Sequence, residues 1–207
     1  MAQAESRAQP TGNDLSDLKR EAAGCKACEL WHVGTQTVFG EGPADARVML
    51  VGEQPGDQED LQGAPFVGPA GKLLDRALEQ AGIRRDEVYV TNAVKHFRWE
   101  ARGKRRIHKK PGMAHVKACH PWLEAEIRVV DAAAIVLLGA TAASSVLGPR
   151  FRLTEHRGEF VDTELDALVT ATVHPSSILR ARDESERETG MAGLVRDLTV
   201  VARATQP

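Results

Sequence analysis

The chain of 207 residues is 42% apolar, which is enough to build one domain around a full-sized hydrophobic core. Its formal net charge is only −2, so the overall charge neither indicates nor excludes a polyanionic partner. The longest apolar run, AAAIVLLGA, is about half the ~20 residues that span a bilayer, and the N-terminus lacks the pattern of a signal peptide. We therefore expect a cytoplasmic protein with no membrane partner.

The N-terminal segment at 1–12 is polar and contains Pro10 and Gly12, so we expect a disordered tail there. A single domain is expected to occupy residues 13–207. It begins with a short predicted helix, which Asn13 or Asp14 caps and Gly24 ends.

Four later segments have the nearly continuous Val, Ile and Leu content of strands that are covered on both faces. They occupy residues 46–53, 88–94, 133–139 and 168–174. Helical patterns lie between and after them, at 69–82, 115–127, 140–148 and 188–202, and Pro121 is a kink or a boundary in the second. This alternation predicts an α/β fold with a parallel sheet.

Side chains capable of chemistry lie at the ends of three of these predicted strands. Ligands of parallel α/β sheets bind beyond the carboxyl ends of the strands. Glu53, Asn92 and His174 lie at three of these ends, and Gly139 lies at the fourth. Asn92 offers one acceptor and two donor hydrogens in a plane, which suits an amide-like base edge. An Asn that caps or turns the chain is the commoner interpretation of this residue taken alone.

Three loops beside the strand ends could hold a ligand. The turn GEQPGD at 52–57 could present backbone N–H groups, or be a simple βα turn; no Gly-Lys-Ser/Thr follows it, so it is not a Walker A loop. In HPSSILR, the hydroxyls after His174 could hold phosphate, or form an ordinary turn. Phe66, in GAPFVGPAG, could stack on a base or anchor its own loop.

Basic residues concentrate in one segment. Between Lys95 and Lys110 there are eight Lys or Arg residues and one acid, Glu100. Within it, GKRRIHKK holds five of them around His108. Such a segment suits a polyanion, although a solvated charged loop is the commoner interpretation of a charge run alone.

Three cysteines form an odd set, which does not indicate a disulfide framework. Cys25 and Cys28 make a CxxC pair, and Cys119 lies far along the chain. A tetrahedral thiolate site needs a fourth ligand from another residue type, for which histidine is suited. The candidates are His32, His96, His115 and His120. The spacing of these residues is compatible with a zinc site, with an iron–sulfur cluster, and with a CxxC pair that binds no metal.

Taken in order, several motifs resemble the uracil-DNA glycosylase superfamily. They are GEQPGDQEDLQGAPFVGPAGKLLDRAL, VYVTNAVKHF, LLGATAA, HRGEF and ATVHPSSILR. The likeness runs from about Cys25 to the C-terminal helix. It is greatest to the iron–sulfur members of the superfamily and, within them, to the X-type family. The segment KRRIH resembles the insertion that distinguishes this family. The resemblance implies a three-layer α/β/α fold with a central four-stranded parallel sheet.

The resemblance also implies a [4Fe–4S] cluster. In related iron–sulfur glycosylases the third cluster cysteine follows NVVK, and His96 takes that place in NAVKHF here. The implied ligands are Cys25, Cys28, His96 and Cys119. A structural role is expected, because glycosidic cleavage needs no redox step.

Roles in base recognition carry over from the family to matching residues. A flipped uracil would stack on Phe66, and Asn92 would read its amide edge. Gln54, Gly56 and Asp57, in the turn at 54–57, would contact the base or hold the turn. His174 would stabilise the charge on the departing base. The implied DNA-binding residues are Arg105, Arg106, Lys109, Ser176, Ser177 and Arg180.

In the X-type family, the resemblance implies that the histidine of KRRIH attacks C1′ of the sugar and stays bonded to it. His108 matches this nucleophile, and Glu53 is the candidate carboxylate that orients it. The expected substrate is uracil in DNA, preferably single-stranded, bound by a monomer near the nucleoid. Two alternatives remain: a conventional multiple-turnover glycosylase in which Glu53 or Asp57 directs water, and a non-catalytic metal-containing module that binds nucleic acid.

Overall fold

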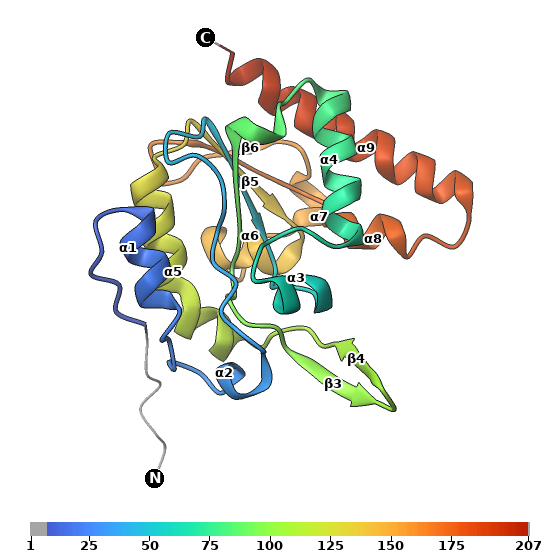
Figure 1. Cartoon of the computed structure of the whole chain (residues 1–207). Helices are drawn as coiled ribbons and strands as arrows, with labels where there is room; N and C mark the ends of the chain where they lie inside the picture. Colours follow the sequence, from blue (N-terminus) through green and yellow to red (C-terminus); the bar gives the residue numbers. More distant parts are fainter. Residues whose placement is uncertain (1–7, 207) are drawn as a thin grey trace.

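The computed structural model describes residues 8–206, which surround a five-stranded sheet (Figure 1). The strand order is β2 (Val88–Asn92), β1 (Val48–Gly52), β5 (Ala134–Leu138), β7 (Leu168–Thr172) and β6 (Phe160–Val161). The first four strands are parallel, which confirms the predicted α/β class. The expected count of four strands is wrong, because β6 adds an antiparallel edge strand whose two residues are too short to show any periodicity.

Helices cover both faces of the sheet and so make three layers (Figure 1). One face packs against α4 (Pro69–Ala81), α8 (Pro175–Leu179) and α9 (Glu184–Ala204). The other packs against α5 (Met113–Val130) and α6 (Ala140–Leu147), and α1 (Leu15–Ala22) lies outside α5. Short helical segments complete the chain: α2 (Leu30–Val33), α3 (Asp57–Gln62), η1 (Arg85–Glu87) and α7 (Leu153–His156).

Alternating strand residues divide the core between the two faces. Leu50 and Val136 face α4 and α9, whereas Met49 and Ile135 face α5. Every residue of β1, β2 and β5 is buried, which explains their continuous apolar sequence. Pro121 lies inside α5 and does not end the helix.

The N-terminal segment differs from its prediction over the residues that the structure describes. Ala8 is buried, and its backbone N–H donates to the Ala118 carbonyl at 3.1 Å. Thr11 donates its backbone N–H to a Glu21 carboxylate oxygen at 2.8 Å. Residues 8–12 are therefore packed against α5 and α1, while residues 1–7 of the predicted tail lie outside the described residues.

A β-hairpin replaces the expected basic loop. Strands β3 (Trp99–Arg102) and β4 (Arg105–His108) pair antiparallel and project beside α3 (Figure 1). Gly103 opens the two-residue turn with a φ of 61°, as the first central position of a tight hairpin turn requires. Because both faces of the hairpin are largely exposed, no apolar alternation marked it in the sequence. Among the helices of residues 8–206, none is long and apolar enough to cross a membrane.

Candidate active site

A pocket of about 640 Å³ opens where the carboxyl ends of the parallel strands meet. Glu53 follows β1, Asn92 ends β2, and Gly139 and His174 follow β5 and β7; all four line this pocket. The sheet register explains the convergence, since Gly52 pairs with Asn92 across neighbouring strands. The predicted strand-end residues thus lie around one cavity.

Phe66 forms one wall of the pocket in an unusual backbone conformation. Its φ is 56°, in the left-handed region that bulky residues rarely adopt, and its side chain is buried. Two glycines make room for it. A Cβ at Gly71 would lie 1.6 Å from the Phe66 carbonyl oxygen, and one at Gly52 would lie 2.7 Å from the Phe66 ring. Such a conformation persists where its surroundings enforce it, typically at ligand sites.

His174 lies opposite, with its ring centroid 6.0 Å from that of Phe66 and the two ring planes inclined by 30°. Burial lowers the pKa of His174 to about 4, so the imidazole is neutral at physiological pH. Its Nδ1 accepts the Ser176 backbone N–H at 3.1 Å. The single ring proton of the neutral form is therefore on Nε2, where it can be donated to a ligand.

The hydroxyls predicted to hold phosphate support His174 in the structure. Ser176 Oγ lies 2.8 Å from His174 Nδ1 and accepts a hydrogen bond from Arg180 at 3.1 Å. Ser177 Oγ donates to the His174 carbonyl at 2.7 Å. All three residues line the pocket, and Ser177 and Arg180 are also exposed to solvent.

Glu53 has two partners in the pocket. Thr141 Oγ1 donates to one carboxylate oxygen, and His108 Nε2 lies 3.4 Å from the other. Burial raises the pKa of Glu53, but these neighbours outweigh it and hold the pKa below its usual value. The carboxylate is therefore ionised. Thr141 was missed in the sequence, although LLGATAA places it just beyond a strand end.

His108 reaches the pocket from the hairpin, as the last residue of β4. It is half-exposed, and its ring lies 6.1 Å from that of Phe97. The 3.4 Å separation from Glu53 is slightly longer than a good hydrogen bond, as is common for catalytic pairs without substrate. The structure thus joins a residue of the projecting hairpin to a residue of the buried sheet.

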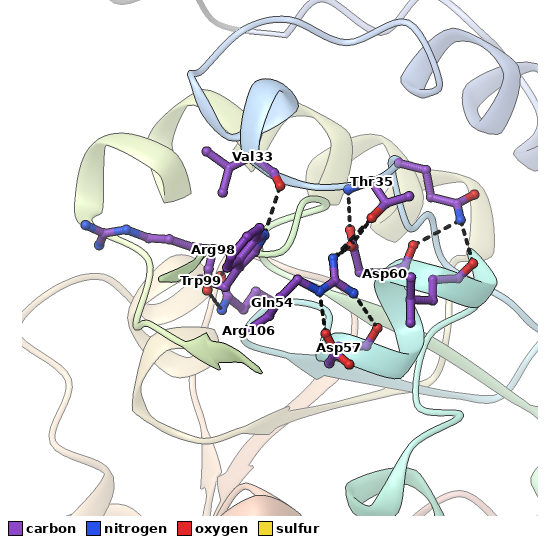
Figure 2. A network of polar contacts seen from close by, with 10 residues as sticks. Val33, Thr35, Gln54, Asp57, Asp60, Arg98, Trp99 and Arg106 are labelled. Atoms are coloured by element: carbon purple, nitrogen blue, oxygen red, sulfur yellow. Dashed lines mark hydrogen bonds and ion pairs between the residues drawn. The ribbon is translucent and has the colours of Figure 1, made fainter. Parts of the chain in front are cut away.

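Gln54 and Arg106 fasten the hairpin, as Figure 2 shows. The Gln54 amide accepts the Arg98 N–H at 3.1 Å and donates to the Arg98 and Lys109 carbonyls. Arg106 donates to Asp57 and to the fully buried Asp60, both at 2.6 Å. The Arg106 guanidinium also lies 5.5 Å from the ring centroids of Phe97 and Trp99.

These contacts bear on three predicted roles. Arg106, predicted to bind DNA phosphate, is ion-paired within the chain to Asp57 and Asp60, and its use on DNA stays a prediction. Asp57 does not line the pocket, whereas Gln54 lines it and bonds to the hairpin through its amide. Both side chains thus hold the local structure, which is one of the two roles expected for them. Arg105 is exposed, and Lys109 pairs with Glu100 at 2.8 Å.

One further residue of the pocket was not singled out in the sequence. Glu59 is buried, and one carboxylate oxygen accepts the Gly68 N–H at 2.8 Å, which joins the two loops of the pocket. Lys110 also lines the pocket. The signal for Glu59 was present in GDQED, but acids at a helix start are common as capping groups and do not stand out.

The three cysteines gather in one apolar cluster with Leu18, Leu30 and Trp122. Cys119 Sγ accepts the Lys95 N–H at 3.2 Å, and Cys25 Sγ accepts the Trp122 indole N–H at 3.3 Å. Burial raises the pKa of Cys119 to about 12, and Cys25 and Cys28 contribute to the rise while Lys95 opposes it. Among residues 8–206, no three Cys, His, Asp or Glu side chains are arranged around a single metal ion.

His96 is buried beside this cluster, and its Nε2 lies 3.0 Å from Thr37 Oγ1. Thr37 in turn donates to the Ala22 carbonyl at 3.0 Å, in the helix that precedes the CxxC pair. Burial lowers the pKa of His96, which keeps the imidazole neutral as a metal ligand must be. His115 is used elsewhere: it accepts the Gly112 N–H and lies 2.6 Å from a Glu29 oxygen.

The fold and the pocket together define an α/β protein with a cavity at the carboxyl edge of its parallel sheet, where ligands of such folds bind. Residues 39–199 match the family model of the uracil DNA glycosylase superfamily. The chain belongs to this superfamily.

Three relatives carry the name type-4 uracil-DNA glycosylase. The protein from Thermotoga maritima is 40% identical over 164 residues, which cover 79% of this chain and 82% of the relative. The one from Sulfurisphaera tokodaii is 35% identical, with coverage of 81% and 76%. The one from Pyrobaculum aerophilum is 32% identical, with coverage of 86% and 92%.

Proposed function

We propose that this protein excises uracil from DNA, preferably single-stranded, and becomes attached through His108 to C1′ of the resulting abasic sugar, as the X-type family does. The observation that carries the proposal is the 3.4 Å approach of His108 to the ionised Glu53 at the pocket. The names of the relatives support the excision of uracil. The fastened hairpin supports a role for His108 beyond that of a solvated loop residue.

In this mechanism the flipped uracil enters between Phe66 and His174, and the Asn92 amide reads its polar edge. The bond between C1′ and the base nitrogen breaks, and its electron pair leaves with the base. The proton on His174 Nε2 is donated in a hydrogen bond to the uracil oxygen on which the charge develops. Stabilisation of this kind contributes a few kcal/mol to catalysis.

The covalent step uses a nitrogen lone pair of the His108 imidazole. This pair forms the new bond to C1′, which leaves an imidazolium, and the remaining ring proton passes to solvent. The Glu53 carboxylate stabilises the positive charge on the sugar and then on the imidazolium. The released uracil anion takes up a proton from water, so charge and protons balance.

We further propose that Cys25, Cys28, Cys119 and His96 hold a [4Fe–4S] cluster. The sulfurs of Cys119 and Cys25 accept N–H donors, as iron–sulfur sulfurs commonly do. Bound there, the cluster would supply a cross-link, and the reaction would need no redox step from it. Its ligands would join the CxxC segment, the chain after β2 and α5.

The test is a denaturing gel. The protein is mixed with a uracil-containing single-stranded oligonucleotide, boiled in SDS and compared with a thymine control. A shifted band that survives boiling with uracil alone, and that is lost in His108→Ser, supports covalent attachment. Strand scission after alkali without a shifted band indicates a conventional glycosylase. If neither the shifted band nor strand scission is seen, the remaining interpretation is a module that only binds nucleic acid.

The cluster is tested separately by absorbance near 400 nm. His96→Cys should retain this absorbance, because thiolate is the usual ligand, whereas His96→Ala should lose most of it. Full absorbance in the alanine variant would contradict the assignment of His96 and return the choice to His32, His115 and His120.

A further inference from the structure

A second concave surface lies away from the proposed catalytic pocket and shares no residue with it. We propose that this surface binds a protein partner through a short segment that carries both apolar and basic side chains. The cavity has a volume of about 780 Å³ and lies between α5, α6 and the segment at 161–167 that precedes β7. We refer to it as the distal groove.

The floor of the distal groove is apolar. Its large apolar side chains are only partly buried by the chain itself, and they are Ile127, Val146, Leu147, Phe151 and Leu165. Removing such side chains from water is favourable at roughly 25 cal/mol per Å². A concave apolar surface of this kind therefore fits a ligand with apolar side chains.

The rim of the groove is acidic. Asp131, Asp162, Glu164 and Asp166 line it, and none of them has an ion-pair partner among residues 8–206. Glu124 also lines the groove but faces His120 at 3.3 Å. Against these acids stands one arginine, Arg128. The rim is thus complementary to Lys and Arg side chains and repels DNA.

The segment at 161–167 combines both features. Its residues alternate in exposure, so that Val161, Leu165 and Ala167 are half-buried while Asp162 and Glu164 project to solvent. The segment connects the antiparallel strands β6 and β7 and bends at 164–167. Its alternation places carboxylates beside the apolar floor, which suits a partner that carries apolar and basic side chains together.

The position of the groove leaves the catalytic pocket accessible. Asp131 and Ala132 precede β5, and Ala167 precedes β7, so the groove lies at the amino ends of these strands. The catalytic pocket lies at their carboxyl ends. A partner at the distal groove can therefore bind while DNA occupies the other edge of the sheet.

The experiment uses the full-length protein and a fluorescein-labelled synthetic peptide of alternating Leu and Lys residues. A Leu and Glu peptide of the same length is the control probe. Fluorescence anisotropy should show binding of the Leu and Lys peptide only. The variant Asp162→Asn/Glu164→Gln/Asp166→Asn should weaken it at least tenfold, and Leu147→Lys should weaken it by a similar factor.

A matched variant controls for net charge. Asp45→Asn/Glu79→Gln/Glu188→Gln removes the same three charges from exposed positions outside the groove, and should leave binding within twofold of the original protein. Equal weakening by both triple variants would overturn the proposal, because it would show only general attraction to an acidic protein. Absence of binding would also overturn it.

Analytical sedimentation of the protein without peptide tests whether a second copy of the chain occupies the distal groove. A dimer that dissociates in Leu147→Lys would overturn the proposal of a separate partner, since a second copy would then fill the groove. A monomer in both supports it. Uracil excision by the groove variants is measured in parallel, and its loss or retention reports on the catalytic pocket independently of peptide binding.

Discussion

Thr141 holds the Glu53 carboxylate in the orientation from which it faces His108. A hydrogen bond to an ionised carboxylate stabilises the charged form and lowers its pKa. Thr141→Val should therefore raise the pKa of Glu53 and slow adduct formation roughly tenfold. In a pH–rate profile, the acid limb should move to higher pH. A slower reaction with an unmoved limb would contradict the positioning role and indicate a packing defect instead.

His174 links the pH to stability through its burial. Its pKa is near 6.5 in the unfolded chain and about 4 in the folded protein, so the unfolded state binds more protons between these values. Stability should then be complete above about pH 6.5 and fall as the pH drops toward 4, by about 3 kcal/mol from this residue.

Urea unfolding at pH 7 and pH 4.5 measures this effect in the original protein and in His174→Asn. The loss of stability on acidification should be smaller in the variant, because Asn has no proton to bind. An equal loss in both proteins would mean that other groups, and not His174, carry the acid sensitivity.

At the scale of elements, the β3–β4 hairpin is the structural device that brings His108 to Glu53. Two neighbouring arginines of β4 have opposite surroundings, which provides a matched comparison. Arg106 is paired with Asp57 and Asp60, whereas Arg105 is exposed. Arg106→Gln leaves the buried Asp60 without its cation, and should release the hairpin.

We expect adduct formation by Arg106→Gln to slow by roughly 10- to 100-fold, since misplacement of a nucleophile by about 1 Å has effects of this size. Single-turnover gels with increasing oligonucleotide should show the loss in the maximal rate. Arg105→Gln should instead weaken DNA binding and flatten its salt dependence, with the maximal rate preserved. Similar behaviour of the two variants would argue against the fastening role of Arg106.

The whole molecule shows which features the sequence could predict. The parallel strands were predictable because burial on both faces leaves continuous apolar runs, and the strand-end rule then placed Glu53, Asn92 and His174 together. The hairpin could not be predicted, because its exposed strands carry no apolar pattern. The pairing of Arg106 with Asp60 could not be predicted either, because these residues lie 46 positions apart in the chain. Disorder at residues 8–12 was predicted from their composition alone, and composition does not reveal that α5 and α1 offer these residues a surface to pack against.

The segment at 92–96 connects the catalytic pocket with the proposed cluster site. It carries Asn92 into the base pocket, and its Lys95 Nζ donates to the Asn92 carbonyl at 2.8 Å. The same lysine forms a buried ion pair with Glu126 and donates its backbone N–H to Cys119. His96, the proposed fourth ligand, follows at once. Movement at the cluster should therefore reach the base-reading amide.

Removal of the cluster by oxidation and chelation should expose this connection. We expect amide hydrogen exchange to become faster in residues 92–99 and in the first half of α5, because both segments lose their cross-link to Cys25 and Cys28. The segment at 168–180, which holds His174 and no proposed ligand, should change little. Unaltered exchange at 92–99 would mean that the buried Lys95–Glu126 pair alone fixes Asn92, and that the cluster stabilises only the N-terminal helices.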